Sequence, residues 1–504
     1  MSEAASARSH RAGPDAGTTP DRTTPDRTPA PREAAEVSRD TWDGRDARGT
    51  GQAAAERLAA LDPLLRAWLP RQRWFAAKGR ALGRLRPVSA VEVLPPGRPG
   101  GAPGLLHLLV DVDGDVYQLL LGLRAVLPAA LAPALVGRVD SGPYTGLTAY
   151  EALGDPRLAG LLWERLRSPG TLGPLRFERD PHAHVPAGAL PRSLSREQTN
   201  SSLVYGDTHI LKVFRRVGPG LNPDLELPRA LAEAGCARVP APVAWYEAHD
   251  GGPDGERLTL GVVQPYLAGS HDGWQLALAR LAADGPFTAE AHALGHATAE
   301  VHRALARALP TRVLDPEATA ALAAGMTERL AATAREVPEL RPYAARLRTA
   351  FDDLAATDGL RVPVQRIHGD LHLGQTLRTP DGHWSLIDFE GEPARPLAER
   401  RRPEPAVRDV AGMLRSFDYA ARSRHPFSPD WAADCRDAFC AGYAAASGRD
   451  PREDAVLLRA YETDKAVYEA RYEASHRPDW LHVPLAAIHR LAAETRTPHT
   501  PTQP

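Results

Sequence analysis

Cysteine is scarce in this sequence, which has only Cys236, Cys435 and Cys440 among its 504 residues. Three thiols cannot build the disulfide framework of a small secreted domain. No group of Cys and His residues has the spacing of a zinc site. The thiol content is typical of a reducing compartment, and we expect the protein to be cytoplasmic.

An excess of either charge is also lacking. Lys and Arg number 61 against 63 Asp and Glu, which leaves a net charge of −2. This balance argues against a general attraction to nucleic acid or to an anionic membrane. The N-terminus has no apolar core of a secretory signal, and the longest apolar stretch, residues 119–137, is interrupted by Arg124, Pro128 and Pro133. We therefore expect no nucleic-acid partner, no membrane partner, and a substrate that is recognised by a local site.

The chain is long enough for two to four domains, and its composition changes along its length. The first residues contain the direct repeat TTPDRTTPDR and few large apolar side chains, which predicts disorder. Alternating apolar residues around Asp113-Gly114 predict a β-hairpin. In the segment Arg71–Phe75 we favour a contact with a neighbouring domain over a ligand site. The predicted organisation is a disordered tail (1–52), a small α+β cap domain (53–150), a connecting segment with a strand-rich lobe (151–267), a helical lobe (268–492) and a second disordered tail (493–504).

The most informative segment is HGDLHLGQT, residues 368–376, followed after a predicted hairpin at Asp381-Gly382 by LIDFEG, residues 386–391. Phosphoryl transfer needs one carboxylate that orients and deprotonates the attacking hydroxyl, and a second that holds Mg²⁺ on the phosphates. Asp370 and Asp388 can fill these positions, with the Gln375 carboxamide as a further metal ligand. The short hairpin between the two motifs would bring both carboxylates together.

These residues resemble the phosphotransferase branch of the protein-kinase-like fold, which includes aminoglycoside and choline kinases. The resemblance implies that Asp370 is the catalytic base, that Asp388 and Gln375 bind Mg²⁺, and that the nucleotide is ATP. It departs from the usual pattern at Gln375, where those kinases have Asn. His368 is expected to support the loop by hydrogen bonding, and Asp409, in the first turn of a predicted helix from Arg408 to Ala421, to brace it.

A kinase small lobe also needs a lysine on a strand, an acidic partner on the next helix and a hinge for the nucleotide base. Lys212 lies in the predicted strand HILKVF, residues 209–214. Its expected partner is Glu226, with Asp224 as the second choice. Ser201, at the end of a polar segment of residues 195–202, is expected to contact the phosphates. Gln264 and Tyr266 end the predicted hinge strand, and we assign all these residues except Asp224 to ATP.

The similarity extends further, to the actinobacterial maltokinases. It covers residues from about 53 to 490 and includes LPRQRWFAAKGR, EQTNSSLVYGDTHILKVFRR, LIDFEGEPARPLAERR and KAVYEARYEASHRPDWLHVPL. The resemblance implies an α+β, two-lobed kinase-like fold preceded by a cap domain. It also implies phosphorylation of maltose by ATP at the anomeric hydroxyl, giving maltose 1-phosphate for α-glucan (glycogen) synthesis from trehalose. Trehalose synthase, as a separate chain, is a possible partner on this view.

An acceptor site can be placed on the predicted helix near the C-terminus. Tyr461, Lys465, Tyr468 and Tyr472 are spaced to share one helical face, and Trp480 follows closely. Spacing alone favours a structural face. The family resemblance reverses that preference and implies that Lys465, Tyr468, Tyr472 and Trp480 bind the sugar.

Two alternatives remain open at this point. The first is a kinase for another small hydroxylated acceptor, such as an aminoglycoside or choline. Cationic acceptors usually need a strongly acidic pocket, which the helix with Lys465 does not offer. The second is a catalytically silent kinase-like module that regulates a glucan enzyme. The presence of Asp370, Gln375, Asp388 and Lys212 argues against it.

Overall fold

The structure is a computed structural model that describes residues 49–76, 82–97, 101–194, 199–249, 256–357, 361–393 and 395–493. Both tails predicted from the sequence therefore lie mostly outside the described residues. Helix α1 begins at Gly49 and ends at Trp68, so the boundary at residue 52 was placed too late. No helix within the described ranges is long and apolar enough to cross a lipid bilayer.

Alternating apolar residues give the cap domain an antiparallel sheet that is buried on both faces. In strand β2 (Gly104–Val112), Leu106 and Leu108 pack in the cluster that contains α1, whereas Leu105 and Leu109 pack toward the next lobe. Successive side chains of a strand point to opposite faces, so one strand can serve two cores. The sheet order is β1-β2-β3-β5-β4, with β1 at Leu85–Leu94, β3 at Asp115–Arg124, β4 at Leu135–Arg138 and β5 at Thr148–Glu151.

The small lobe is a second antiparallel sheet, with the strand order β6-β7-β12-β13-β10-β9-β8. Its helices are α2 (Pro156–Arg167) and α3 (Pro223–Glu233), and Asn222 caps α3 by accepting from the backbone nitrogen of Asp224. The strands are β6 (Gly170–Leu172), β7 (Leu175–Arg179), β8 (Pro191–Leu194), β9 (Asn200–Tyr205), β10 (His209–Phe214), β12 (Ala244–His249) and β13 (Arg257–Pro265).

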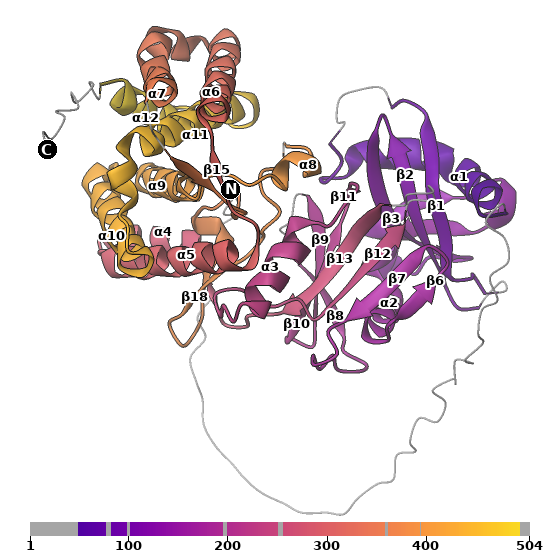
Figure 1. Cartoon of the computed structure of the whole chain (residues 1–504). Coiled ribbons are helices and arrows are strands. Elements are labelled where there is room, and N and C mark those ends of the chain that lie inside the picture. The colour runs from indigo at the N-terminus through magenta and orange to yellow at the C-terminus, as the bar shows by residue number, and fades with distance from the viewer. Residues whose placement is uncertain are drawn as a thin grey trace, which may run out of the picture.

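Cap and small lobe share a core and a backbone connection. Strand β11 (Arg216–Val217), directly after β10, pairs with β3 of the cap sheet. The cap residue Gln118 is fully buried, donates to the carbonyls of Phe214 and Leu260, and accepts from the Tyr246 hydroxyl. Because buried polar groups need such partners, this junction fixes the cap onto the lobe. Figure 1 shows the two sheets side by side on one side of the molecule, with the helices of the large lobe on the other.

The large lobe is mainly helical. Gly295 and Gly442 let two of its helices, α5 and α10, approach closely, since a Cβ at either position would lie about 2 Å from a carbonyl oxygen of the other helix, at 2.0 and 1.9 Å. The helices are α4 (Gly273–Ala282), α5 (Thr288–Ala308), α6 (Pro316–Glu336), α7 (Ala344–Ala356), α8 (Leu397–Arg400), α9 (Val407–Arg422), α10 (Pro429–Ser447), α11 (Ala455–His476) and α12 (His482–Ala493). Short strands complete the lobe: β14 (His271–Asp272), β15 (Arg312–Leu314), β16 (Val362–Val364), β17 (Thr376–Arg378) and β18 (Trp384–Leu386).

The architecture confirms the predicted α+β, two-lobed fold with an N-terminal cap, and corrects several element boundaries. The strand predicted at 364–367 ends at Val364. Gln365 forms an isolated bridge with Glu404, and the backbone nitrogens of His368 and Gly369 bind the Asp409 carboxylate. The strand predicted at 384–389 ends at Leu386, before Asp388 turns into the left-handed region. The helix predicted at 338–356 begins as a 3₁₀ turn, Pro338–Tyr343, which contains two prolines that cannot donate a helical hydrogen bond.

Candidate active site

The catalytic loop, residues 368–376, runs between β16 and β17 and is held from below by α9. The buried carboxylate of Asp409, in the first turn of α9, accepts from the backbone nitrogens of His368 at 2.8 Å and Gly369 at 2.9 Å. Burial opposes its charge, but the bond with His302 and the loop amides lower the pKa of Asp409. The His368 ring bonds the carbonyl of Ile387 at 2.9 Å. The structure thus places Asp409 and His368 where the sequence suggested supporting roles.

Asp370 projects from this loop toward α11. Its Oδ1 lies 3.1 Å from Nζ of Lys465, whose ammonium also lies 3.0 Å from Oε1 of Glu392. Burial works against the ionised carboxylate, but the Lys465 charge overrides it and holds the pKa of Asp370 well below its ordinary value. Burial lowers the pKa of the adjacent His372 to about 4. At neutral pH the carboxylate is therefore charged and faces one cation.

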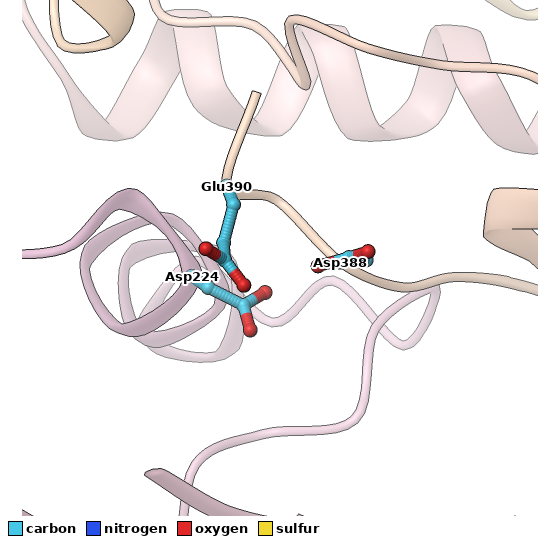
Figure 2. A group of neighbouring side chains, drawn as sticks. All are labelled: Asp224, Asp388 and Glu390. Atoms are coloured by element: carbon cyan, nitrogen blue, oxygen red, sulfur yellow. The ribbon is translucent and has the colours of Figure 1, made fainter. Parts of the chain in front are cut away.

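A second group of acidic side chains surrounds Lys212 on β10. One carboxylate oxygen from each of Asp224, Asp388 and Glu390 lies within 4.8 Å of the other two, and Figure 2 shows these three side chains pointing toward one another. Nζ of Lys212 lies 2.7 Å from Asp224 and 2.8 Å from Asp388. Burial and the Asp388 charge raise the pKa of Glu390 to about 8.

Three oxygen-donor side chains at this separation fit a hard divalent cation such as Mg²⁺. Gln375 lies at the edge of this group and donates from Nε2 to Asp388 Oδ2 at 3.1 Å. Asp388 adopts φ 67°, a conformation that non-glycine residues rarely take and that occurs at functional sites. Glu390, the last letter of the DFE motif, was missed as a candidate ligand although it stands two residues after Asp388.

The predicted ion pair between Lys212 and Glu226 is wrong. Asp224, the second choice, makes the pair, and its other oxygen accepts from the backbone nitrogen of Phe389 at 2.7 Å. Glu226 points elsewhere and pairs with Arg366 at 2.6 Å. Residues two apart on a helix point in different directions, so only one of these acids can face Lys212.

Ser201 does not face the nucleotide side either. The register of β9 against β10 puts Ser202 opposite Lys212, and Ser201 therefore on the other face. There Ser201 Oγ accepts from Arg215 at 2.8 Å, and the buried Arg215 also pairs with Glu151 at 2.9 Å and lies over the Trp74 ring at 5.1 Å. The Arg71–Phe75 segment thus contacts the neighbouring lobe, as the favoured interpretation had it.

Asn200, which shares a face of β9 with Ser202, opposite Lys212, is a second residue that sequence reasoning missed. Its Nδ2 donates to Glu390 across the cleft. Residues 195–198 of the predicted phosphate-binding segment lie outside the described residues.

The hinge residues lie at the end of β13. Gln264 is paired with Ile210, so it shares a face with Lys212, and its side chain donates to the Pro240 carbonyl at 3.3 Å. The backbone nitrogen of Tyr266 donates to the Thr208 carbonyl at 2.8 Å. Both residues therefore stand where the chain leaves the small lobe, consistent with the predicted hinge position.

Helix α11 carries a line of aromatic rings away from Asp370. Nζ of Lys465 lies 4.9 Å from the Tyr468 ring centroid, and the Tyr468 and Tyr472 rings stack at 6.4 Å. Arg477 lies 5.5 Å from both the Tyr472 and Trp480 rings. Lys465, Tyr468 and Tyr472 thus form one row of side chains, and Arg477 links Tyr472 to Trp480, whose ring stacks on Tyr419. Tyr461 is buried one turn earlier and belongs to the lobe core.

Comparisons with known proteins identify relatives of this chain. The family model described as the maltokinase N-terminal cap domain matches residues 68–155. A glucosamine kinase of Streptacidiphilus jiangxiensis is 31% identical over 340 residues, which cover 61% of this chain and 75% of that protein. A glucosamine kinase of Mycolicibacterium smegmatis is 31% identical over 330 residues, 60% of this chain and 80% of the relative.

The solved structures include a glucosamine kinase in complex with glucosamine, ADP and inorganic phosphate. It is similar with a TM-score of 0.61 and 26% identity, covering 85% of this chain and 98% of its own. Membership of one family therefore accounts for the fold, the cap and the paired acidic motifs. The chain belongs to the family of sugar-kinase-like phosphotransferases that carry a maltokinase-type N-terminal cap and include the glucosamine kinases.

Proposed function

We propose that this protein transfers the γ-phosphoryl group of ATP to the anomeric hydroxyl of maltose, producing maltose 1-phosphate and ADP. The observation that supports this most directly is the position of Asp370. Its carboxylate pairs with Lys465 on the Lys465–Tyr468–Tyr472 surface, and the β17–β18 hairpin joins its loop to Asp388, which pairs with Lys212. A hydroxyl on that surface can reach the base while ATP lies at the hinge.

In the proposed transfer, the one protein group that gains a proton is Asp370. Asp370 accepts the hydroxyl proton as the sugar oxygen forms a bond to the γ-phosphorus, and the bond from that phosphorus to the β–γ bridging oxygen breaks to release ADP. A low pKa makes Asp370 a weak base, but phosphoryl transfer proceeds through a loose transition state and relies mainly on orientation and charge stabilisation. Hydrogen bonding to the charged carboxylate supplies that orientation.

Asp388 and Glu390, with Asp224 close by and Gln375 beside Asp388, are the residues that would hold Mg²⁺. The bound ion would neutralise charge on the phosphates. Lys212 contributes a point charge suited to phosphate oxygens, and Asp224 and Asn200 keep Lys212 and Glu390 in place.

Maltose and glucosamine are the two acceptors to be compared. The tyrosine pair and Trp480 extend over the length of several helical residues, which suits a two-ring sugar with flat C–H faces. Glucosamine is favoured by the names of the relatives. The ammonium group of glucosamine would need a carboxylate partner, and three acidic residues of α11 are already paired with arginines. The pairs are Glu462 with Arg436 at 2.6 Å, Glu469 with Arg415 at 2.7 Å and Glu473 with Arg477 at 2.5 Å. On the maltose proposal the product would serve α-glucan synthesis, with trehalose synthase as a separate partner chain.

The test is to incubate the full chain with ATP, Mg²⁺ and, in separate reactions, maltose, glucose and glucosamine. Phosphorus NMR identifies the position of the new phosphate. The proposal expects an anomeric phosphate on maltose that is absent without Mg²⁺ and absent in Asp370→Asn. Transfer to glucosamine alone would assign the chain the acceptor of its relatives, and no transfer to any sugar would refute the proposal.

A further inference from the structure

One charged side chain on the acceptor side has no obvious part in phosphoryl transfer. The Lys465 ammonium is shared between Asp370 at 3.1 Å and Glu392 at 3.0 Å, and only 19% of its side chain is exposed. Desolvation opposes the charge, but the two carboxylates raise the pKa of Lys465. The residue is therefore a fixed cation beside the catalytic carboxylate.

Glu392 is already largely neutralised by other groups. Its Oε2 lies 3.0 Å from Arg408 and 3.2 Å from Arg395. The second neighbour of the base, His372, has its pKa lowered to about 4 by burial and is uncharged at neutral pH. Among the described residues, Lys465 is thus the cation that directly pairs with the Asp370 charge.

We propose that Lys465 determines the charge preference of the acceptor site, because it cancels the Asp370 charge and so selects neutral sugars over sugars that carry an ammonium group. This inference rests on the proposed function, since it assumes that the acceptor is a sugar that reaches Asp370.

The geometry brings the ammonium group of an amino sugar close to the ammonium of Lys465. A reacting hydroxyl must lie roughly 2.6–3.2 Å from Asp370, so an amino group on a neighbouring carbon falls well inside the ~8 Å Debye length from Lys465. Two like charges at about 6 Å, with an effective dielectric constant of about 20, repel by the equivalent of about 100-fold in affinity. Asp370 and solvent offset part of this repulsion, and we expect a net change in affinity of about tenfold or more.

The experiment compares maltose with glucosamine in the wild type and in two variants of the full chain. Affinities come from titration calorimetry in the presence of ADP and Mg²⁺, so that a variant with reduced turnover still gives a result. Lys465→Met should improve glucosamine binding relative to maltose by about tenfold or more. Glu392→Gln, which removes one of the two carboxylates that offset the Lys465 charge, should change this affinity ratio in the opposite direction.

Arg471→Met is the matched control. Arg471 lies on the same helix, and its removal also deletes one positive charge, but it is 57% exposed and pairs with Glu336 at 2.6 Å on the surface. The ratio of its affinities for maltose and glucosamine should equal that of the wild type. An unchanged ratio in both Lys465→Met and Glu392→Gln, or an equal shift in Arg471→Met, would overturn the inference while maltose phosphorylation stands. Preference of the wild type for glucosamine would overturn it too, whereas a wild type without any sugar phosphorylation refutes the proposed function itself.

Discussion

Replacement of Asp224 by Asn tests the assignment of the lysine partner. The side chain is fully buried and receives two donors, Nζ of Lys212 at 2.7 Å and the backbone nitrogen of Phe389 at 2.7 Å. Asn keeps the shape and one acceptor oxygen but removes the charge. Lys212 would then be held mainly by Asp388, at 2.8 Å.

The size of the effect follows from the kind of contact that is lost. Hydrogen bonds to charged groups contribute about 1.5–3 kcal/mol, which corresponds to about 10- to 150-fold in an equilibrium or rate constant. On the proposal that Lys212 contacts the phosphates of ATP, the loss should appear in kcat/KM for ATP. The affinity for maltose should change little, since Asp224 lies on the other side of the cleft from α11.

Glu226→Gln is the control, since it removes the same charge two residues away on the same helix. Glu226 pairs with Arg366 at 2.6 Å, so its loss should affect the melting temperature more than the use of ATP. Steady-state kinetics with varied ATP at saturating maltose, together with thermal melting, separate the two variants. If Glu226→Gln impaired ATP use and Asp224→Asn did not, the assignment would be refuted.

Three further outcomes are expected. Asp370→Asn should reduce turnover by on the order of 10²-fold or more while calorimetry shows nearly unchanged nucleotide binding; near-normal turnover would exclude Asp370 as the base. Arg215→Met removes a buried cation paired with the cap and should lower the melting temperature clearly more than Arg216→Met, whose side chain is 44% exposed; equal losses would contradict the buried junction. Burial raises the pKa of Glu390 from 4.5 to about 8, so this group stabilises the metal-free fold below about pH 4.5 and loses that contribution as the pH rises through about 8. With chelator present, Glu390→Gln should therefore melt higher than the wild type at pH 9, and identical pH dependence of melting would argue against the shift.

The parts of the site that the sequence predicts well are those built by adjacent residues. The loop of residues 368–376 and the Asp388–Glu390 motif are joined by the β17–β18 hairpin, whose turn at Gly382 has φ 86°. The turn can be read directly from Asp381-Gly382, and it places Gln375 and Asp388 side by side. Local chemistry was sufficient here because few residues separate the two motifs.

The errors concern the direction in which side chains point. Ser201 was chosen over its neighbours although alternation along a strand makes that choice a matter of register. The hairpin offered a way to decide: Tyr205 and His209 flank a three-residue loop, so counting back from their pair puts Ser202 opposite Lys212. Asn200 then shares that face.

For Asp224 and Glu226 no hairpin was available from which to count the register. Both stand in the first turn of α3, after the Asn222 cap, and either could face the strand lysine until the orientation of the helix is known. That orientation is set by contacts from distant parts of the chain, including the Asp224 bond to the backbone of Phe389. Local spacing cannot supply this information.

The two sides of the cleft differ in their charge balance, and this difference accounts for the separate roles proposed for them. Around Lys212 lie three carboxylates, one of which, Glu390, is also 3.8 Å from Arg400. Burial, together with the negative charge of Asp388, raises the pKa of Glu390. Such a group is stabilised by a divalent cation. Around Asp370, Lys465 and the arginines that hold Glu392 offset the acidic side chains. A site with this balance has no electrostatic reason to bind a cation, so a metal ion and a neutral sugar would each be directed to its own side of the catalytic carboxylate.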